Sequence, residues 1–252
     1  MNMNKLFDLQ GKVAIVTGGY GHLGSAMVRA LLAANATVIV AGRSVDRFFA
    51  AFSSLECESL HFREIDVTDS DSIKRFFTDI IAHFGSVDIL VNNAAVQFPQ
   101  NSIEDITEQQ LERTFKTNIF SMFYITSAAL PHFKPGCCII NTTSITAYRG
   151  SKDLIDYSST KGAIVSFTRS LALSLIGNNI RVNAVAPGPI WTPLIPSSYS
   201  PQKVGQFGST APIGRPGQPV ELASAYVFLA SPEASYITGE TIHVNGGDFI
   251  GG

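Results

Sequence analysis

Short apolar runs alternate along this chain with segments that have the length and periodicity of helices. The apolar runs fall at residues 13–16, 37–41, 60–65, 89–91, 138–141 and 180–186. Helical segments include residues 24–34, 70–84 and 155–175. Strands that alternate with helices are joined by crossover connections, which make the strands parallel and place helices on both faces of the sheet. The pattern therefore predicts an α/β fold built on a doubly wound parallel sheet.

The composition limits what such a fold could be used for. The chain has 252 residues, of which 45% are hydrophobic and 15% charged, and its formal net charge is −2. This length suits one large α/β domain, and the sequence contains no linker or repeat, so we predict a single domain over residues 1–252. Lys and Arg are scattered, which argues against the basic footprint of a nucleic-acid-binding protein.

The sequence carries no pattern for export, membrane insertion or metal binding. No apolar run is long enough to span a bilayer, and the N-terminal residues lack the apolar core of a secretory signal. The five histidines are dispersed, and Cys57, Cys137 and Cys138 have no metal-ligand spacing. We therefore expect a cytoplasmic protein with free thiols, no membrane partner and no metal site.

Residues 187–219 differ from the rest of the chain because they are rich in Pro, Gly and Ser and show little periodicity. They follow a predicted strand, so they begin at the carboxyl edge of the sheet, where open α/β folds bind ligands. Long irregular segments within compact domains commonly serve as lids or binding loops. We predict a substrate loop at about residues 189–218; the alternative, a disordered excursion, fits poorly with Trp191, Tyr199 and Phe207.

A glycine-rich turn follows the first predicted strand and leads into the first predicted helix. Gly19, Gly21 and Gly24 satisfy the pattern G-x-G-x-x-G. Glycines at this spacing permit a tight turn and bring the backbone and the helix N-terminus close to a diphosphate. We therefore predict a Rossmann-like dinucleotide site. Its diphosphate end is formed by Gly18, Gly19, Tyr20, Gly21, His22, Leu23 and Gly24.

The end of the second predicted strand indicates which dinucleotide is bound. Residues 38–44 contain no Asp or Glu to accept a hydrogen bond from the ribose hydroxyl of NAD, but they contain Arg43 and Ser44. A guanidinium suits the 2′-phosphate of NADP. We predict a preference for NADP(H), with NAD(H) as the alternative cofactor, and we expect Gly42→Asp to shift binding toward NAD.

Polar and small residues at two further strand ends complete the predicted cofactor site. Asp66 and Val67 follow the third strand, where an aspartate can accept a hydrogen bond from the adenine amino group. Asn93, Ala94 and Ala95 follow the fourth strand, where small side chains would let a flat ring system lie against the backbone.

Tyr157 and Lys161 are four residues apart in a predicted helix, so their side chains share one face. A neighbouring ammonium group favours the phenolate, and we expect it to lower the pKa of Tyr157 from about 10 toward neutral pH. A hydroxyl tuned in this way can exchange a proton with a carbonyl or alcohol oxygen. Ser144 lies upstream and is the third member of this candidate catalytic group.

Together these motifs resemble the short-chain dehydrogenase/reductase family, in its single-domain branch, over essentially the whole chain. The residues that carry the resemblance are the glycine turn, Asp66, Asn118, Ser144, the Tyr157/Lys161 pair, Pro187-Gly188 and the closing segment 239–247. Segment 186–194 and the closing segment are similar to bacterial aldehyde reductases and sugar or polyol dehydrogenases. His22 and Ala95 stand where the family commonly has glycine.

The resemblance implies specific catalytic roles. Tyr157 would be the general acid or base, and Lys161 would lower its pKa and hydrogen-bond the nicotinamide ribose. Ser144 would hold the substrate oxygen and stabilise the developing alkoxide. Asn118 would help to position a water for a proton relay.

Further expectations follow for the nicotinamide end of the site. Thr192 would contact the carboxamide, with the backbone of Ile190 nearby, and Pro187 and Gly188 would complete the cofactor contacts. The substrate would lie against residues 96–98, 145–156 and the loop after Pro189.

The resemblance implies an NADP(H)-preferring oxidoreductase that interconverts a small-molecule carbonyl and an alcohol, and it implies a homotetramer. An NAD-linked sugar or polyol dehydrogenase is the alternative within the enzymes. A nucleotide-binding sensor without turnover is the alternative outside them. A sensor would be expected to have lost part of the catalytic group, whereas all four residues are present here.

Overall fold

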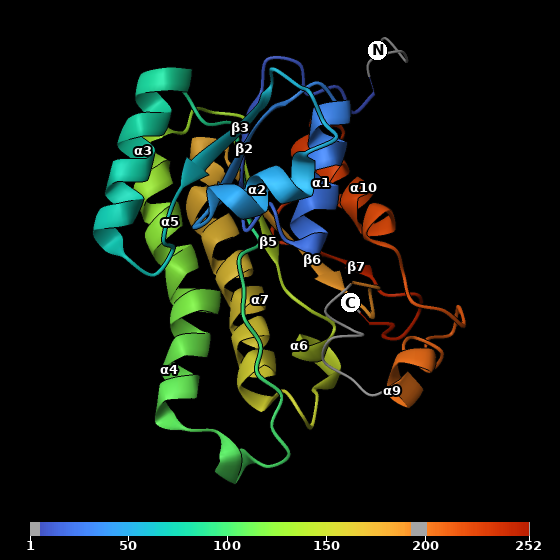
Figure 1. Cartoon of the computed structure of the whole chain (residues 1–252). Coiled ribbons are helices and arrows are strands. Elements are labelled where there is room, and N and C mark those ends of the chain that lie inside the picture. Colours follow the sequence, from blue (N-terminus) through green and yellow to red (C-terminus); the bar gives the residue numbers. More distant parts are fainter. Residues whose placement is uncertain (1–5, 193–200, 252) are drawn as a thin grey trace.

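The computed structural model describes residues 6–192 and 201–251, and a seven-stranded sheet lies at its centre (Figure 1). The strands are β1 Val13–Thr17, β2 Thr37–Gly42, β3 Leu60–Glu64, β4 Ile89–Asn92, β5 Cys138–Thr142, β6 Arg181–Pro187 and β7 Thr241–Val244. Their order is β3-β2-β1-β4-β5-β6-β7, and every neighbouring pair is parallel. The predicted doubly wound sheet is confirmed. The strand order reverses between β1 and β4, which is where such folds bind ligands.

Helices cover both faces of this sheet. They are α1 His22–Ala33, α2 Val45–Phe52, α3 Ser70–Phe84, α4 Glu108–Phe115, α5 Ser121–Ala129, α6 Thr146–Arg149, α7 Ile155–Leu175, α9 Pro201–Gly205 and α10 Pro219–Ala230. One face packs against α1, α2 and α10, and the other packs against α3, α5 and α7 (Figure 1). A π-helical segment, Lys116–Phe120, joins α4 to α5.

A hydrophobic core lies on each face of the sheet, and the two cores explain why the strands are continuous apolar runs in the sequence. In β1, Ala14 and Val16 face the core beneath α1 and α10, whereas Ile15 faces the core beneath α3 and α7. Both sets are fully buried. A parallel strand covered on both sides needs apolar side chains at successive positions.

The helix boundaries agree closely with the predicted segments where the caps are readable in the sequence. Asp69 accepts hydrogen bonds from the backbone N–H groups of Asp71 and Ser72 at the start of α3, and Gly85 ends this helix with φ of 74°. These are common capping residues. The structure adds one strand that the pattern missed, because β7 has only four residues, all of them half-buried.

A buried polar ladder holds α7 to the middle of the sheet. Asn92 Nδ2 donates to Asn141 Oδ1 at 2.9 Å, and Asn141 Nδ2 donates to Thr168 Oγ1 at 3.0 Å. These groups are almost completely buried. Because buried amides are stable only when they are hydrogen-bonded, the ladder favours one position of α7 relative to β4 and β5.

Part of the predicted substrate loop, residues 193–200, lies outside the described residues. On either side of these residues, backbone hydrogen bonds hold the chain in place. Gly217 N donates to Pro189 O at 2.9 Å, and Trp191 N donates to Gly217 O at 2.8 Å. Ile213 N donates to Gly246 O at 3.1 Å, which ties the loop to the segment after β7.

The described residues lack two kinds of feature. None of the helices in residues 6–192 and 201–251 is long and apolar enough to cross a membrane. Over the same residues, no group of three or more His, Cys, Asp or Glu side chains could hold a metal ion.

Candidate active site

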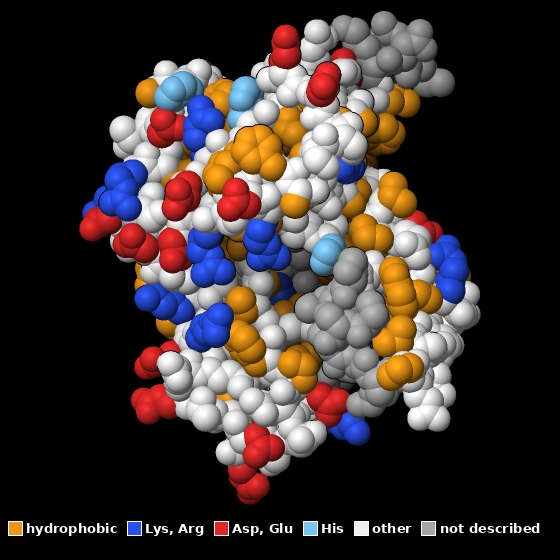
Figure 2. Space-filling view, in the orientation of Figure 1, with side chains coloured by type: hydrophobic (Ala, Val, Ile, Leu, Met, Phe, Trp, Pro, Cys, Tyr) orange, Lys and Arg blue, Asp and Glu red, His pale blue; other side chains and the backbone are white. Residues whose placement is uncertain are grey.

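A cleft of about 640 Å³ opens at the carboxyl edge of the sheet. It is lined by residues from the ends of β1, β2, β3, β4, β5 and β6 and from the N-terminal half of α7. Figure 2 shows the hollow, with Lys and Arg side chains beside it. Because so many strand ends contribute, residues that are far apart in the sequence share one surface.

The glycine turn forms one end of the cleft with its backbone. Gly18 has φ of 64° and donates its N–H to Ala41 O, and Gly21 N donates to Gly18 O at 2.9 Å. A Cβ atom at Gly24 would lie 2.8 Å from Gly19 Cα and closer still to Gly18 O. The start of α1 can approach the turn this closely only without a side chain at position 24, which leaves a backbone cradle that fits a diphosphate.

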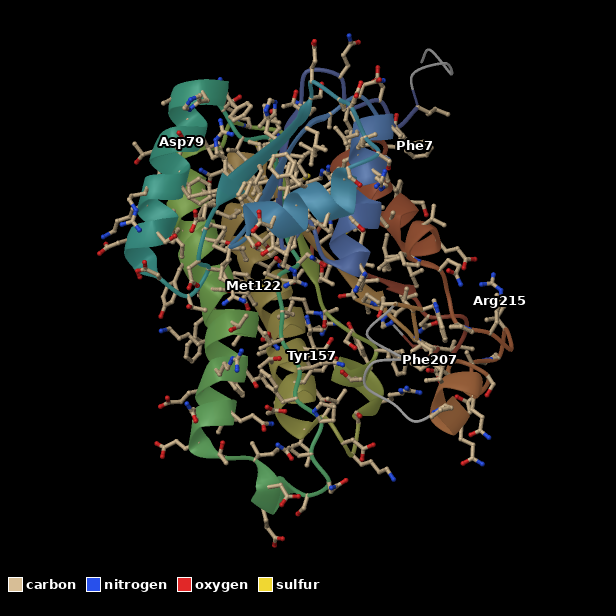
Figure 3. The ribbon with its side chains drawn as sticks, viewed as in Figure 1. Phe7, Asp79, Met122, Tyr157, Phe207 and Arg215 are labelled. Carbon is tan, nitrogen blue, oxygen red and sulfur yellow. The ribbon has the colours of Figure 1, made fainter. Side chains whose placement is uncertain are left out.

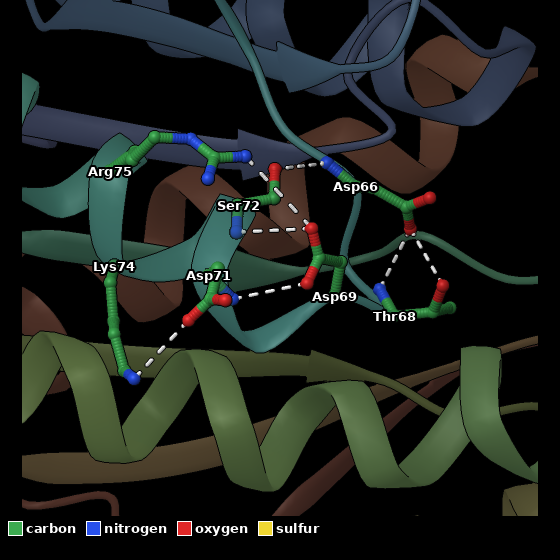
Figure 4. A network of polar contacts seen from close by, with 7 residues as sticks. All are labelled: Asp66, Thr68, Asp69, Asp71, Ser72, Lys74 and Arg75. Atoms are coloured by element: carbon green, nitrogen blue, oxygen red, sulfur yellow. Dashed lines mark hydrogen bonds and ion pairs between the residues drawn. The ribbon is translucent and has the colours of Figure 1, made fainter.

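The carboxylate predicted to contact adenine lies at the next part of the cleft. Asp66 Oδ1 accepts hydrogen bonds from Thr68 N at 2.8 Å and from Thr68 Oγ1 at 2.7 Å (Figure 4). Burial opposes its ionisation, but the Thr68 hydrogen bonds and the charges of Arg43 and Lys116 outweigh burial and hold the pKa of Asp66 below its ordinary value. The backbone N–H of Asp66 donates to Ser72 Oγ, so the first turn of α3 fixes this strand end.

Thr17 ties the ends of β1 and β4 together beneath the middle of the cleft. Its Oγ1 accepts from Asn93 N at 2.9 Å and from Ala94 N at 3.0 Å, and Asn93 Nδ2 donates to Thr17 O at 3.0 Å. Ala94 and Ala95 line the cleft with small side chains. These hydrogen bonds fix a wall of small side chains that suits a planar ring system.

The far end of the cleft is built from the end of β6. Ile145 N donates to Pro187 O at 2.9 Å, and Gly188 N donates to Val244 O at 2.9 Å. A Cβ atom at Gly188 would lie 2.6 Å from Asn245 Cα, so only glycine lets β6 and β7 approach here. Ile190 and Thr192 line the cleft beyond this contact.

Ser144, Tyr157 and Lys161 meet in the cleft between these two ends. Tyr157 lies on α7, and Phe207 from the substrate loop lies across from it (Figure 3). A hydrogen bond links the Ser144 and Tyr157 side chains. Lys161 Nζ lies 5.3 Å from the centroid of the Tyr157 ring and donates to Thr142 O at 2.7 Å. Thr143 Oγ1 donates to the carbonyl oxygen of Lys161, which fixes α7 against the end of β5.

The electrostatics of this trio differ from the expectation drawn from the sequence. Burial raises the pKa of Tyr157 to about 12, although its hydrogen bond with Ser144 acts in the opposite direction. Burial also lowers the pKa of Lys161 to about 7. The expected lowering of the Tyr157 pKa is therefore wrong. Removal from water penalises both charged forms, so a lysine that readily becomes neutral gives the phenolate little help.

Asn118 does not line the cleft, but its side chain is hydrogen-bonded to Val96, which does. Its Oδ1 accepts from Val96 N at 2.8 Å, and its Nδ2 donates to Val96 O at 2.9 Å and to Thr160 Oγ1 at 3.2 Å. The side chain therefore connects the segment after β4 to α7, close to Tyr157. The proposed water contact of Asn118 stays a prediction.

Most of the residues predicted for the cofactor and for catalysis line the cleft, but three do not: Gly19, Ser44 and Asn118. Gly19 faces the core, where an added Cβ would meet Val28 and Val40. The Ser44 side chain accepts from Arg47 N as the N-cap of α2. Its predicted phosphate contact would therefore compete with the cap.

Two arginines line the cleft although the sequence did not predict them there. Arg47 lies on α2, four residues beyond Arg43, and Arg113 lies on α4 with its Cζ 4.8 Å from the centroid of the Phe98 ring. The four-residue spacing between Arg43 and Arg47 could have predicted that Arg47 lies near the same site. No local sequence signal distinguishes Arg113 from other arginines on exposed helix faces.

Comparison with known proteins places the chain among described relatives. A family model described as enoyl-(acyl carrier protein) reductase matches residues 21–248. The uncharacterized oxidoreductase YhdF of Bacillus subtilis is 56% identical over 247 residues, covering 96% of this chain and 85% of that protein. NADPH-dependent aldehyde reductase 1, chloroplastic, of Arabidopsis thaliana is 46% identical over 256 residues, covering 96% and 88%.

A solved structure agrees with the sequence relatives. The crystal structure of a short-chain dehydrogenase/reductase from Brucella melitensis, described as a glucose/ribitol dehydrogenase, superposes with a TM-score of 0.87. It is 31% identical, and the match covers 97% of this chain and 99% of that one. With its parallel sheet, glycine turn and Ser144–Tyr157–Lys161 cleft, this chain belongs to the short-chain dehydrogenase/reductase family and is an oxidoreductase.

Proposed function

We propose that this protein is an NADP(H)-preferring oxidoreductase that interconverts a small-molecule carbonyl and an alcohol, with Tyr157 as general acid and base. The observation that carries the proposal is the meeting of Ser144, Tyr157 and Lys161 in one cleft, next to a wall suited to a planar ring. The dinucleotide, when bound, supplies or accepts the hydride. The residues of the chain would position the cofactor and the substrate and would transfer the proton.

The protonation states of Tyr157 and Lys161 favour the reductive direction at neutral pH. A Tyr157 hydroxyl with its pKa raised to about 12 holds its proton and can donate it to a carbonyl oxygen that gains negative charge. Ser144 would hold the same oxygen through its hydroxyl. Lys161, with its pKa lowered to about 7, would be able to return a proton toward Tyr157 after the transfer.

Cofactor contacts follow from the same cleft. The backbone of residues 18–24 would hold the diphosphate, Asp66 and Val67 the adenine, and Ala94, Ile190 and Thr192 the nicotinamide end. Arg43 would contact the 2′-phosphate. The NADPH-dependent aldehyde reductase of Arabidopsis thaliana, 46% identical, supports the choice of NADP(H).

A second candidate is an NAD-linked sugar or polyol dehydrogenase, favoured by the description of the Brucella melitensis protein. Assaying the purified protein against aldehydes, ketones, sugars and polyols with both cofactors separates the two. Turnover of aldehydes or ketones with NADPH supports the proposal, whereas turnover of sugars or polyols with NAD alone supports the alternative. A folded protein that binds cofactor but turns over none of these substrates would point to a sensor.

Replacing Arg43 with alanine should weaken NADPH binding by about 10–150-fold and leave NADH binding within about threefold. A charge-assisted hydrogen bond contributes about 1.5–3 kcal/mol, and only NADPH has the phosphate that would form it. Dissociation constants for both cofactors, measured by nicotinamide fluorescence, give the result. Arg75→Ala, at an exposed arginine of α3, is the matched control. An unchanged ratio of the two constants would argue against a role for Arg43.

We also propose a homotetramer, with the helices that carry Asn118 and Tyr157 at one interface. Phe120, Phe123, Tyr124 and Leu173 are large apolar residues exposed on α5, α7 and the π-helical segment. Leu173 is 80% exposed, so Leu173→Glu should leave the protomer folded while it disrupts association. Light scattering should then give a lower mass than for wild type, and Val45→Glu on α2 should not. An unchanged mass would remove this face from the interface.

The expected location is the cytoplasm, and the three unpaired cysteines fit a reducing compartment. Burial raises the pKa of Cys138 to about 12, so this thiol stays protonated in the core. Fractionation of cells that produce the protein tests the location. Recovery from a secreted or membrane fraction would contradict it.

A further inference from the structure

The side chain of Tyr20 occupies the space above the last residue of β2. A Cβ atom at Gly42 would lie 2.7 Å from Tyr20 Cζ and 2.9 Å from Tyr20 Oη, and closer still to Cε1. Gly42 is a buried strand residue without a positive φ, so its backbone would accept a side chain. The ring of Tyr20, rather than the backbone, keeps position 42 free of one.

Two contacts hold the ring in this place. Arg43 N donates to Tyr20 Oη at 3.0 Å, and the guanidinium of Arg47 lies over the ring with its Cζ 5.4 Å from the centroid. The Ser44 cap in turn fixes the backbone of Arg47. Moving Tyr20 aside would therefore break a hydrogen bond and a cation–π contact.

This arrangement lies where dinucleotide sites choose their cofactor. A carboxylate at the end of the second strand binds the adenosine ribose hydroxyls of NAD, whereas arginines accommodate the 2′-phosphate of NADP. Here the ring fills the space that such a carboxylate would need, and Arg43 and Arg47 line the same cleft with exposed side chains. Asp66, the carboxylate on the neighbouring strand end, has Oδ1 engaged by Thr68.

We propose that Tyr20 is a cofactor-specificity residue of this chain. It excludes an acidic side chain from position 42, and it holds the Arg43 backbone and the Arg47 guanidinium where a phosphate monoester on the adenosine ribose can meet them. This inference rests on the proposed preference for NADP(H). It corrects the expectation that Gly42→Asp by itself shifts binding toward NAD, because Tyr20 stands where the new side chain would go.

The test is a double-mutant cycle between positions 20 and 42, read as dissociation constants of NADPH and NADH for the free protein. Gly42→Asp alone should weaken NADPH by at least about tenfold, since a carboxylate repels the phosphate, and should leave NADH within about threefold of wild type. Adding Tyr20→Ala to Gly42→Asp should tighten NADH at least about tenfold relative to Gly42→Asp alone.

A matched pair separates the ring from its hydroxyl group. Tyr20→Phe combined with Gly42→Asp keeps the ring and should not recover NADH binding, whereas Tyr20→Ala combined with Gly42→Asp should. Melting temperatures of all variants identify any that fail to fold. If Gly42→Asp alone tightens NADH as much as the double variant does, or if the Phe and Ala pairs behave alike, Tyr20 is not the blocking residue.

The cycle also distinguishes this inference from the proposed function beneath it. A wild-type protein that binds NADH more tightly than NADPH would refute the preference for NADP(H). The coupling between positions 20 and 42 for NADH would still report whether Tyr20 blocks the site. A preference for NADPH without such coupling would leave the proposed function standing and overturn the role of Tyr20.

Discussion

Replacing Tyr157 with phenylalanine should lower kcat for carbonyl reduction by about 10²–10⁴-fold, which is the usual contribution of a positioned general acid. Phenylalanine keeps the ring that lines the cleft and removes only the hydroxyl that is hydrogen-bonded to Ser144. NADPH affinity and the melting temperature should therefore change little. The measurement is steady-state kinetics on the best substrate from the screen, with a cofactor titration of the same preparation.

Tyr236→Phe is the matched control, because Tyr236 is fully exposed and should tolerate loss of its hydroxyl. Wild-type turnover in the control and loss in Tyr157→Phe would assign the effect to the position of the phenol. If Tyr157→Phe retained most of its turnover, another group would have to supply the proton, and the role of Tyr157 would have to be withdrawn.

Replacing Lys161 with methionine should make the cofactor-free protein more stable at about pH 6 and slightly less stable at about pH 10. Burial lowers the pKa of Lys161 from 10.5 to about 7 in the folded protein. Between these values the unfolded chain binds more protons than the folded one, so the stability of the wild-type protein rises with pH across this window. Below about pH 7 the full penalty for the buried charge applies.

The size of the effect follows from the shift. At about 1.4 kcal/mol per pKa unit, the buried ammonium costs about 4–5 kcal/mol below neutral pH. Methionine removes this cost but also removes the hydrogen bond to Thr142 O, which contributes about 1 kcal/mol. A net gain of about 3–4 kcal/mol at about pH 6 should therefore become a loss of about 1 kcal/mol at about pH 10.

Denaturant unfolding of the free enzyme across this pH range measures the difference. Lys152→Met, at an exposed lysine, should follow the wild-type curve throughout. Parallel curves for wild type and Lys161→Met would mean that Lys161 titrates normally in the fold. The same Lys161→Met variant should also bind NADPH more weakly, since it loses the group proposed to contact the nicotinamide ribose.

Local patterns determined the general architecture. Apolar runs separated by helix-length segments predicted six of the seven strands and their parallel arrangement, because a strand buried on both faces must be apolar throughout. The seventh, β7, is short and half-buried on the edge of the sheet, so its four residues carry no such pattern. The helices α3 and α7 were predictable to their ends.

The sequence by itself also identified most of the residues that meet at the cleft. Two of these features are local: the spacing of Tyr157 and Lys161 on one helix, and the glycines after β1. They do not depend on how the other segments of the chain pack. Their electrostatics are not local. The pKa of Tyr157 is raised because the fold removes it from water, a result that depends on neighbours from several segments.

Only the tertiary structure decided how the cofactor end is built. Tyr20 and Gly42 are on different segments, and nothing in either segment shows that the ring of one fills the space above the other. Steric exclusion between distant residues depends on distances of a few tenths of an ångström, which composition and periodicity do not encode. The chemistry of the site could be predicted from residue types, whereas its selectivity depends on which space the folded chain leaves empty.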